Sequence, residues 1–508
     1  MFCRVNSVAM EGLSSYMVNV EVDVGKGLPV FDMGGYLAGE VKEAKERVRV
    51  ALKNSGYELR PQRITINISP ADVRKDGTGF DLPIALGILG ANREIKTQEF
   101  NEGIVIGELS LDGTVNPVRG VLPSVCAAAQ HGYSYCIVPA GNYAEGKLVK
   151  GINIIGVHSV REAVEYLNVK KVPKVNRIGY CESESSDERF DFSDIKGQET
   201  AKRATMVAVA GMHNILYVGA PGSGKTMLAK RIPSIMPVMT FEEQLEVSKV
   251  YSIAGLVNRK APLIKERPFR APDRSVTSTA LLGGGRIPMP GEVTLSGKGV
   301  MFLDELTEYR PSVLESLRQP LEDKKVCIVR LKQSCSFPAD FMLAAAMNPC
   351  KCGYYPDRSR CHCTDYDIKR FIGKISKPFW DRLDICVQVN DVGPDRIRER
   401  EVELEGTSAY MRGKVELARK RQLERFSDMG IYFNSQMDSS QVQRYCVLGR
   451  EEQEFMNRVY QSFHLTARGY YRILKTARTV ADIEENENIT VQHLSEALSY
   501  RSYQAVIG

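Results

Sequence analysis

The segment from Gly219 to Thr226 reads G-x-x-x-x-G-K-T, and it constrains the fold more than any other feature of the chain. The apolar run at 214–218 before it is typical of a buried strand, and the segment 225–233 after it can open a helix. In such a unit, backbone N–H groups and the positive end of the helix surround a phosphate. The sequence therefore predicts a nucleotide-binding α/β domain rather than a chance glycine loop.

Every residue of this loop is a candidate nucleotide contact. We expect Lys225 to reach the outer phosphates and Thr226 to hold Mg²⁺, so ATP and Mg²⁺ are the predicted cofactors. The full set of predicted contacts is Gly219, Ala220, Pro221, Gly222, Ser223, Gly224, Lys225 and Thr226.

Two further apolar runs end in polar residues suited to the same site. The run 300–303 is followed by Asp304 and Glu305: the aspartate can hold Mg²⁺ and the glutamate can act as the base toward an attacking water. The run 341–347 ends at Asn348, whose amide can orient that water. The alternatives are an ordinary strand end with solvated acids and a turn asparagine before a proline.

The chain is long enough for several domains. It has 508 residues, 43% of them hydrophobic, and a formal net charge of +6, which agrees with an anionic partner without requiring one. No apolar run approaches a membrane span, and residues 1–6 lack the start of a secretory signal. We therefore expect a cytoplasmic protein with no membrane partner and with reduced cysteines.

The pattern along the chain predicts an α/β multidomain protein. Residues 1–168 alternate helices, such as 39–54 and 121–130, with strands, such as 64–68 and 135–138. Four segments are expected: a first domain at 1–168, a polar linker at 169–191, the nucleotide domain at 192–390, and a helical domain at 391–508.

The order of these motifs resembles that of the AAA+ ATPases. The resemblance implies a Walker A loop at 219–226, a Walker B strand at 300–305 and a sensor-1 residue at Asn348. It also implies an arginine finger at Arg382, in Trp380-Asp-Arg-Leu-Asp384, and a second sensor at Arg468. A permanent cation suits a developing phosphate charge, but either arginine could instead form a surface ion pair.

Two insertions resemble those of the helix-2-insert branch of AAA+ proteins, which includes magnesium-chelatase motor subunits. One is the Gly/Pro-rich stretch between the two Walker motifs, and the other is a basic segment at 321–338 that is expected to form a hairpin. In a ring such a hairpin points into the pore, where Lys324, Lys325 and Arg330 could track a phosphate backbone. A solvated charged hairpin is the alternative.

Several longer phrases resemble the YifB/ComM family of magnesium-chelatase-like bacterial ATPases across essentially the whole chain. They include Arg267-Pro-Phe-Arg-Ala-Pro272 and Leu317-Arg-Gln-Pro-Leu-Glu-Asp323. The resemblance implies a homohexameric, ATP-driven DNA helicase for branch migration in natural transformation, acting on branched or single-stranded DNA. A chelatase-like motor that remodels a partner protein is the alternative. Asp273 and Arg274 stand where the family commonly has two histidines, so pore or substrate contacts are expected to differ.

The first domain resembles the Lon-protease fold, in which a lysine activates a catalytic serine. Gly79 stands at the serine position, and the lysine region at 119–124 holds no lysine. The resemblance therefore implies a Lon-like (S5-like) α+β domain without the catalytic dyad, which serves as a platform for ring assembly or nucleic acid.

A cysteine cluster follows Asn348 closely. Its two C-x-C pairs could close a tetrahedral zinc site, although each pair is spaced more tightly than is usual. Reduced thiols on a loop are the alternative. The candidate ligands are Cys350, Cys352, Cys361 and Cys363.

Overall fold

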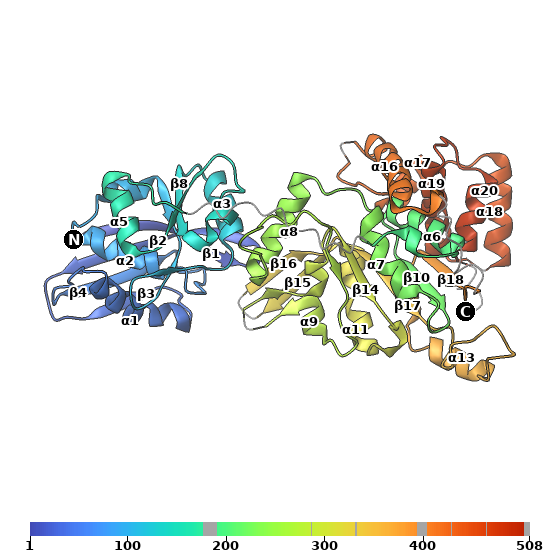
Figure 1. Cartoon of the computed structure of the whole chain (residues 1–508), viewed down its shortest axis with the longest axis horizontal. Coiled ribbons are helices and arrows are strands. Elements are labelled where there is room, and N and C mark those ends of the chain that lie inside the picture. Colours follow the sequence, from blue (N-terminus) through green and yellow to red (C-terminus); the bar gives the residue numbers. More distant parts are fainter. Residues whose placement is uncertain are drawn as a thin grey trace.

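The computed structural model describes residues 1–175, 190–285, 287–330, 333–393, 404–427, 429–463 and 465–501. Its N-terminal part, the parallel sheet with the phosphate-binding loop, and the C-terminal helices follow one another along the longest axis (Figure 1). The segment 176–189, which makes up most of the predicted linker, lies outside the described residues.

The N-terminal part combines a four-stranded sheet in the order β1-β2-β4-β3 with a three-stranded parallel sheet in the order β5-β8-β9 and a small β6-β7 ladder. This agrees with the expected mixture of strands and helices. The strands are β1 (Phe2–Glu11), β2 (Ser14–Gly25), β3 (Phe31–Gly34), β4 (Arg63–Ser69), β5 (Gly103–Val105), β6 (Glu108–Leu109), β7 (Val115–Asn116), β8 (Tyr135–Pro139) and β9 (Asn153–Val157). The helices are α1 (Gly39–Asn54), α2 (Asp81–Ala91), α3 (Val121–Gln130), α4 (Tyr143–Gly146) and α5 (Val160–Val169).

Helix α2 forms the centre of this part, because every one of its residues is buried. Its one carboxylate, Asp81, is neutralised by Arg47, whose Nε and Nη2 donate to it at 2.8 and 3.0 Å. A buried charge is tolerated only with such partners, so this ion pair lets an otherwise apolar helix carry an acid into the core.

The central part is built on a five-stranded parallel sheet in the order β11-β14-β17-β10-β18. The carboxyl ends of its strands meet at one edge, and that edge carries the phosphate-binding loop. The strands are β11 (Phe269–Arg270), β14 (Val300–Leu303), β17 (Met342–Met347), β10 (Ile215–Gly219) and β18 (Ile385–Val389). Two short ladders accompany the sheet: β12 (Gly283–Gly284) with β13 (Met289–Pro290), and β15 (Lys325–Arg330) with β16 (Gln333–Pro338).

Helices cover both faces of this sheet. One face is covered by α6 and α7 together with α16 (Ser408–Arg425) and α19 (Ala467–Ile483) of the C-terminal part. The other face is covered by the β15–β16 hairpin and several short helices. The central helices are α6 (Glu199–Gly211), α7 (Lys225–Ile235), α8 (Phe241–Ala254), α9 (Ser278–Leu282), α10 (Glu292–Leu295), α11 (Pro311–Ser316), α12 (Arg318–Asp323), α13 (Asp365–Ile372) and α14 (Lys377–Trp380).

The C-terminal part is helical, as predicted. Its longest helices begin at threonine caps, Thr407 and Thr466, whose hydroxyls accept from the first-turn backbone N–H groups of Tyr410 and Gly469. The helices are α16 (Ser408–Arg425), α17 (Ser439–Tyr445), α18 (Arg450–Ser462), α19 (Ala467–Ile483) and α20 (Val491–Ser499).

The N-terminal part contacts the central part at two places. The β1–β2 turn at Gly12 lies against Cys335 and Phe337 of the β15–β16 hairpin. Buried Glu145, at the other place, accepts a hydrogen bond from Ser252 Oγ of α8 at 2.5 Å. The N-terminal part is therefore joined to the β15–β16 hairpin and to helix α8 of the central part.

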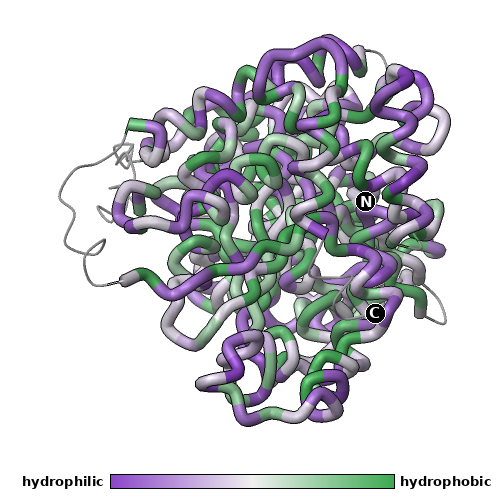
Figure 2. The backbone as a smooth tube through the Cα atoms, turned by 90° about the vertical axis from the view of Figure 1, so that its right-hand side faces the viewer, coloured by the Kyte–Doolittle hydropathy of each residue, from purple (hydrophilic) through white to green (hydrophobic). Residues whose placement is uncertain are grey.

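Hydrophobic stretches gather mainly toward the middle of the backbone trace, and hydrophilic stretches run mainly around its outside (Figure 2). Among the described residues, no helix combines the length and the apolar character needed to cross a membrane.

Candidate nucleotide and metal sites

The phosphate-binding loop joins the buried central strand β10 to helix α7, as the motif predicts. Gly222 and Gly224 have φ values of +82° and +96°, which favour glycine, and helix α7 starts directly after them at Lys225. The loop therefore presents backbone N–H groups and a helix N-terminus at the carboxyl edge of the sheet. Helix α7 runs two residues beyond the predicted end at Pro233, to Ile235.

Lys225 lies across the loop. Its Nζ donates to the carbonyls of Gly219 and Ala220 at 2.8 and 2.7 Å, and to Asn348 Oδ1 at 3.2 Å. Burial lowers the pKa of this ammonium, and the carboxylates of Asp304, Asp391 and Glu305 act in the opposite direction. The ammonium is thus held by neutral oxygens that an anionic phosphate can outcompete.

The predicted magnesium residues meet in space. Thr226 Oγ1 donates to Asp304 Oδ2 at 2.9 Å, which brings the first turn of α7 to the end of β14. A hydroxyl and a carboxylate at this spacing are oxygen ligands of the kind that Mg²⁺ takes beside a nucleotide. Asn348 reaches the same place from the end of β17 through its contact with Lys225.

Glu305 has a left-handed backbone, with φ of +53°, and its carboxylate is bound by the guanidinium of Arg274. The sequence pointed to Arg274 only as a departure from the resembling family, and we expected it to affect pore or substrate contacts. The structure instead brings it to the predicted catalytic base. The two residues are 31 positions apart in the sequence, and the residue pattern around each of them does not predict that they pair.

The two predicted arginines lie together elsewhere. Arg382 and Arg468 both pair with Glu322, and the Arg468 contact measures 3.5 Å. These residues line a cavity of about 910 Å³ together with Lys324 and Arg472. Arg382 lies at the amino end of β18, since Asn214 Nδ2, directly before β10, donates to its carbonyl at 2.8 Å. The arginines are thus at the opposite end of the strands from the phosphate-binding loop.

The basic hairpin is present, but its three predicted cations are not equivalent. Lys324 precedes β15 with a left-handed φ of +54° and faces the cavity beside Arg382, so it is not exposed on the hairpin. Lys325 is exposed at the start of β15. Arg330 ends that strand, and its side chain lies outside the described residues.

The predicted zinc ligands converge. Cys350 Sγ lies 3.3 Å from Cys352 Sγ and 3.7 Å from Cys361 Sγ, and the sulfur atoms of Cys350, Cys352, Cys361 and Cys363 all lie within 4.8 Å of one another. Tetrahedral Zn–S bonds of about 2.3 Å require sulfur atoms about 3.8 Å apart. The donor set and its spacing therefore fit a metal ion, so the cluster could hold one.

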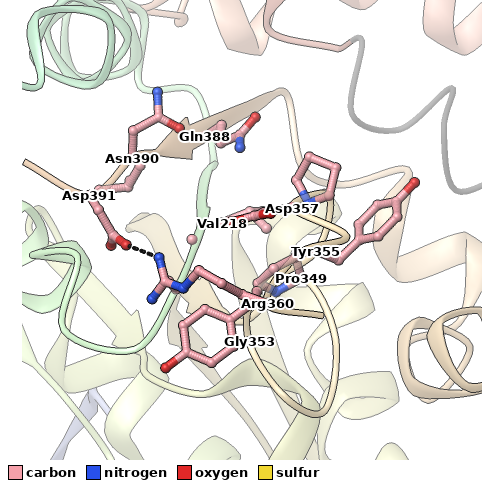
Figure 3. Close-up of a pocket in the computed structure, with 14 residues that line it drawn as sticks. Val218, Pro349, Gly353, Tyr355, Asp357, Arg360, Gln388, Asn390 and Asp391 are labelled. Atoms are coloured by element: carbon pink, nitrogen blue, oxygen red, sulfur yellow. Dashed lines mark hydrogen bonds and ion pairs between the residues drawn. The ribbon is translucent and has the colours of Figure 1, made fainter. Parts of the chain in front are cut away.

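A cavity of about 370 Å³ separates this cysteine loop (349–363) from the end of β18 and borders the phosphate-binding loop at Gly219 and Ala220. Arg360 crosses it to Asp391, with Nη1 and Oδ2 at 3.0 Å, as Figure 3 shows. Its guanidinium lies 4.1 Å from the centre of the Tyr354 ring. The cysteine loop and the phosphate-binding loop are therefore neighbours.

Comparison with known proteins covers most of the chain. Residues 191–397 match the family described as magnesium chelatase, subunit ChlI, and residues 20–142 match a second ChlI family description. Residues 405–501 match the ChlI C-terminal family.

Two relatives are similar over nearly their whole length. The chain is 38% identical to competence protein ComM of Haemophilus influenzae over 98% of this chain and 97% of that protein. It is 36% identical to the uncharacterized protein YifB of Escherichia coli, over 99% and 97%.

A third relative is similar to a shorter part of the chain. Over 129 residues the chain is 33% identical to Lon protease 2 of Bacillus subtilis. This stretch covers 25% of this chain and 23% of that protein. This likeness agrees with the Lon-like character expected from the sequence.

Proposed function

Because this chain belongs to the YifB/ComM family of magnesium-chelatase-like AAA+ proteins, which implies ATPase activity with ATP and Mg²⁺, we propose that it is a ring-forming motor that moves DNA strands. The specific activity proposed is branch migration of DNA junctions in recombination and natural transformation, and one full-length relative is named a competence protein. The observation that carries the motor assignment is the meeting of Lys225, Thr226, Asp304 and Asn348 at one sheet edge.

A ring is supported by the distance between this edge and Arg382. The strand β10 rises about 3.3 Å per residue, so the segment from Asn214 to Gly219 separates Arg382 from the phosphate-binding loop by roughly 17 Å. A cation this far away cannot stabilise phosphate charge in its own subunit. We propose that Arg382 and Arg468 serve the nucleotide of a neighbouring copy in a homohexamer, with Lys225, Asp304, Glu305 and Asn348 acting in their own subunit.

The DNA contact is proposed for the β15–β16 hairpin. Lys325 and Arg330, the first and last residues of β15, give the hairpin positive charge. Ser334 and Ser336 are exposed on β16 and can donate to phosphate oxygens. A Lys325→Ala/Arg330→Ala variant should bind single-stranded DNA more weakly and with a shallower dependence on salt. Lys420→Ala, an exposed lysine on α16, is the matched control.

The test of the function is ATP-dependent dissociation of a synthetic four-way DNA junction, with Lys225→Ala as the control. Wild type should dissociate the junction, whereas Lys225→Ala should fold and leave it intact. ATP turnover without junction dissociation and without stimulation by any DNA would overturn the DNA function. That outcome would favour the second candidate, a chelatase-like motor that remodels a partner protein, which the three matches to a chelatase subunit support.

We also propose that the metal at the cysteine cluster is Zn²⁺ in a structural role. Thiolates prefer this ion, and a closed four-sulfur site leaves no open position for catalysis. Metal analysis of the purified protein should give about one zinc per chain.

A further inference from the structure

We propose that the metal held by the cysteine loop (349–363) fixes the phosphate-binding loop and Asn348 in place, so that nucleotide affinity depends on metal occupancy. The inference rests on the proposed metal site and on the ATPase assignment. It adds a link between them, because the metal would act on the nucleotide site through packing and without touching the nucleotide.

The first connection is along the chain. Strand β17 ends at Met347, and Asn348 and Pro349 alone separate it from the ligand Cys350, which is fully buried. Asn348 is the residue whose Oδ1 accepts from Lys225 Nζ at 3.2 Å. The fixed φ of Pro349 makes this connection stiff, so a metal on Cys350 restrains the amide two residues earlier.

The second connection is a direct contact with the phosphate-binding loop. Gly353 lies in the turn between the two cysteine pairs, and its N–H donates to the carbonyl of Cys350 at 3.1 Å. A Cβ placed on Gly353 would lie 2.5 Å from Pro221 Cδ and 2.9 Å from Pro221 Cγ. The cysteine loop is therefore packed so closely against Pro221 that only glycine fits there.

Apart from the sulfur cluster, the cysteine loop is held by its own backbone turns, by packing of Tyr354 and Tyr355 against the core, and by an ion pair to the segment after β18. The Arg360–Asp391 pair at 3.0 Å joins exposed side chains, and exposed pairs contribute about 0–1 kcal/mol. The sulfur atoms of Cys350, Cys352 and Cys361, by contrast, lie 3.3 to 3.7 Å from one another, an arrangement that a shared metal ion stabilises. Removing the ion should release the loop, and Pro221 would lose the wall on which it packs.

The expected effect is a loss of preorganisation. A phosphate-binding loop that samples more conformations must be ordered when nucleotide binds, which lowers affinity. We expect the dissociation constant of a fluorescent ADP analogue, measured in the presence of Mg²⁺, to be about tenfold higher for the metal-free protein.

Two glycine variants separate the contact from the metal. Gly353→Ala introduces a Cβ against Pro221 but leaves every sulfur in place, so it should retain its metal and bind the ADP analogue about tenfold more weakly. Gly151→Ala is the matched control, because Gly151 has a similar φ of +84° against +88° but a Cβ there meets nothing within 4 Å. It should bind nucleotide as wild type does.

A third measurement uses the wild-type chain and does not depend on how a variant folds. The zinc is removed with a thiol-reactive reagent and a chelator, the stripped protein is returned to Mg²⁺ and reductant, and ADP-analogue binding is titrated before and after Zn²⁺ is restored. Affinity should fall on stripping and recover with zinc, and Cys361→Ser should behave as the stripped protein does.

The outcomes distinguish the claims. Unchanged affinity after the metal has been removed would overturn the coupling while leaving the metal site and the ATPase in place. Wild-type protein that binds no zinc, even when zinc is added, would overturn the metal site and the coupling together, and normal ATP turnover by that protein would leave the motor assignment intact.

Discussion

The two ends of the five-stranded sheet differ in what they offer a nucleotide. At the carboxyl end lie a lysine, Lys225, oxygen ligands that include the Asp304 carboxylate, and the amide of Asn348. The amino end collects cations, with Arg382 and Arg468 on a shared carboxylate, Glu322. One end can bind and position ATP, and the other can stabilise charge that develops on it, so neither end is a complete hydrolytic site.

The cations at the two ends of the sheet also differ in the groups that they bind. At the carboxyl end Lys225 donates only to uncharged oxygens, which suits a site that awaits an anion. At the amino end Glu322 occupies both arginines, although its side chain is 54% exposed. A phosphate from another copy could displace such an exposed carboxylate at small cost. The comparison therefore favours a site completed between two subunits.

The largest expected effect comes from breaking the amino end. Arg382→Ala should lower ATP turnover about 10³–10⁵-fold, the range for an arginine that stabilises transferring phosphate, while nucleotide binding persists. Turnover is measured by phosphate release. Mixing this variant with Lys225→Ala subunits should restore part of the activity, because some interfaces would combine an intact loop with an intact arginine. Absence of any rescue in proven mixed rings would overturn the assignment of Arg382 to the nucleotide of a neighbouring copy.

Glu305→Gln breaks the carboxyl end more gently. An amide cannot accept the proton from water, so turnover should fall about 10²–10⁴-fold while ATP affinity stays near that of wild type. The measurement is single-turnover hydrolysis beside equilibrium ATP binding. The isosteric change keeps the shape of the site, and loss of binding instead of turnover would mean that Glu305 holds the metal rather than the water.

The carboxyl end could be predicted from the sequence, whereas the arrangement of the amino end could not. Gly219 to Thr226 and Asp304 each follow a buried strand, and parallel strands bring their carboxyl ends together, so local patterns suffice. Arg382 and Arg468 were found through family motifs, but their common partner Glu322 is joined to them only by tertiary packing. Lys324 was expected on the hairpin and instead faces the cavity, because its left-handed φ turns the chain there.

The helices and the contacts between the parts of the chain show the same difference between features set by local sequence and features set by tertiary packing. Helices α1 and α3 have their predicted bounds, because buried apolar residues repeat at helical spacing in α1 and because α3 is a short apolar, alanine-rich segment. The interface between Glu145 and Ser252 of α8 has no such local pattern, since it depends on how two separately folded parts meet.

Buried His213 lies at the amino end of the parallel sheet, and its contacts there predict how stability depends on pH. Its Nε2 lies 2.8 Å from Thr479 Oγ1 of α19, and its Nδ1 lies 3.8 Å from Asp384 Oδ2. Burial lowers the pKa of His213 to about 4; Asp384 acts in the opposite direction, and Lys475 and Arg472 add to the lowering. The unfolded chain, with a histidine pKa near 6.5, therefore binds the proton first as pH falls.

Stability should consequently drop between about pH 6.5 and pH 4, by up to about 3 kcal/mol, and the contribution of this residue should level off below that window. The measurement is the midpoint of urea-induced unfolding of the protein as a function of pH. His213→Asn, which cannot titrate, should lose this part of the dependence. An identical acid sensitivity in both proteins would assign it to other groups.

The smallest expected effect concerns Arg274, which binds the Glu305 carboxylate at the carboxyl end. Both side chains are about half exposed, and exposed pairs are weak, so the restraint on the base should be modest. Arg274→Gln should free Glu305 to orient water and raise basal turnover, by less than about fivefold. Arg259→Gln, an exposed arginine on the loop after α8, should leave the rate unchanged. A slower Arg274→Gln enzyme would make Arg274 a contributor to the reaction at the carboxyl end, and Arg382 and Arg468 would not be the only arginines that serve the reaction.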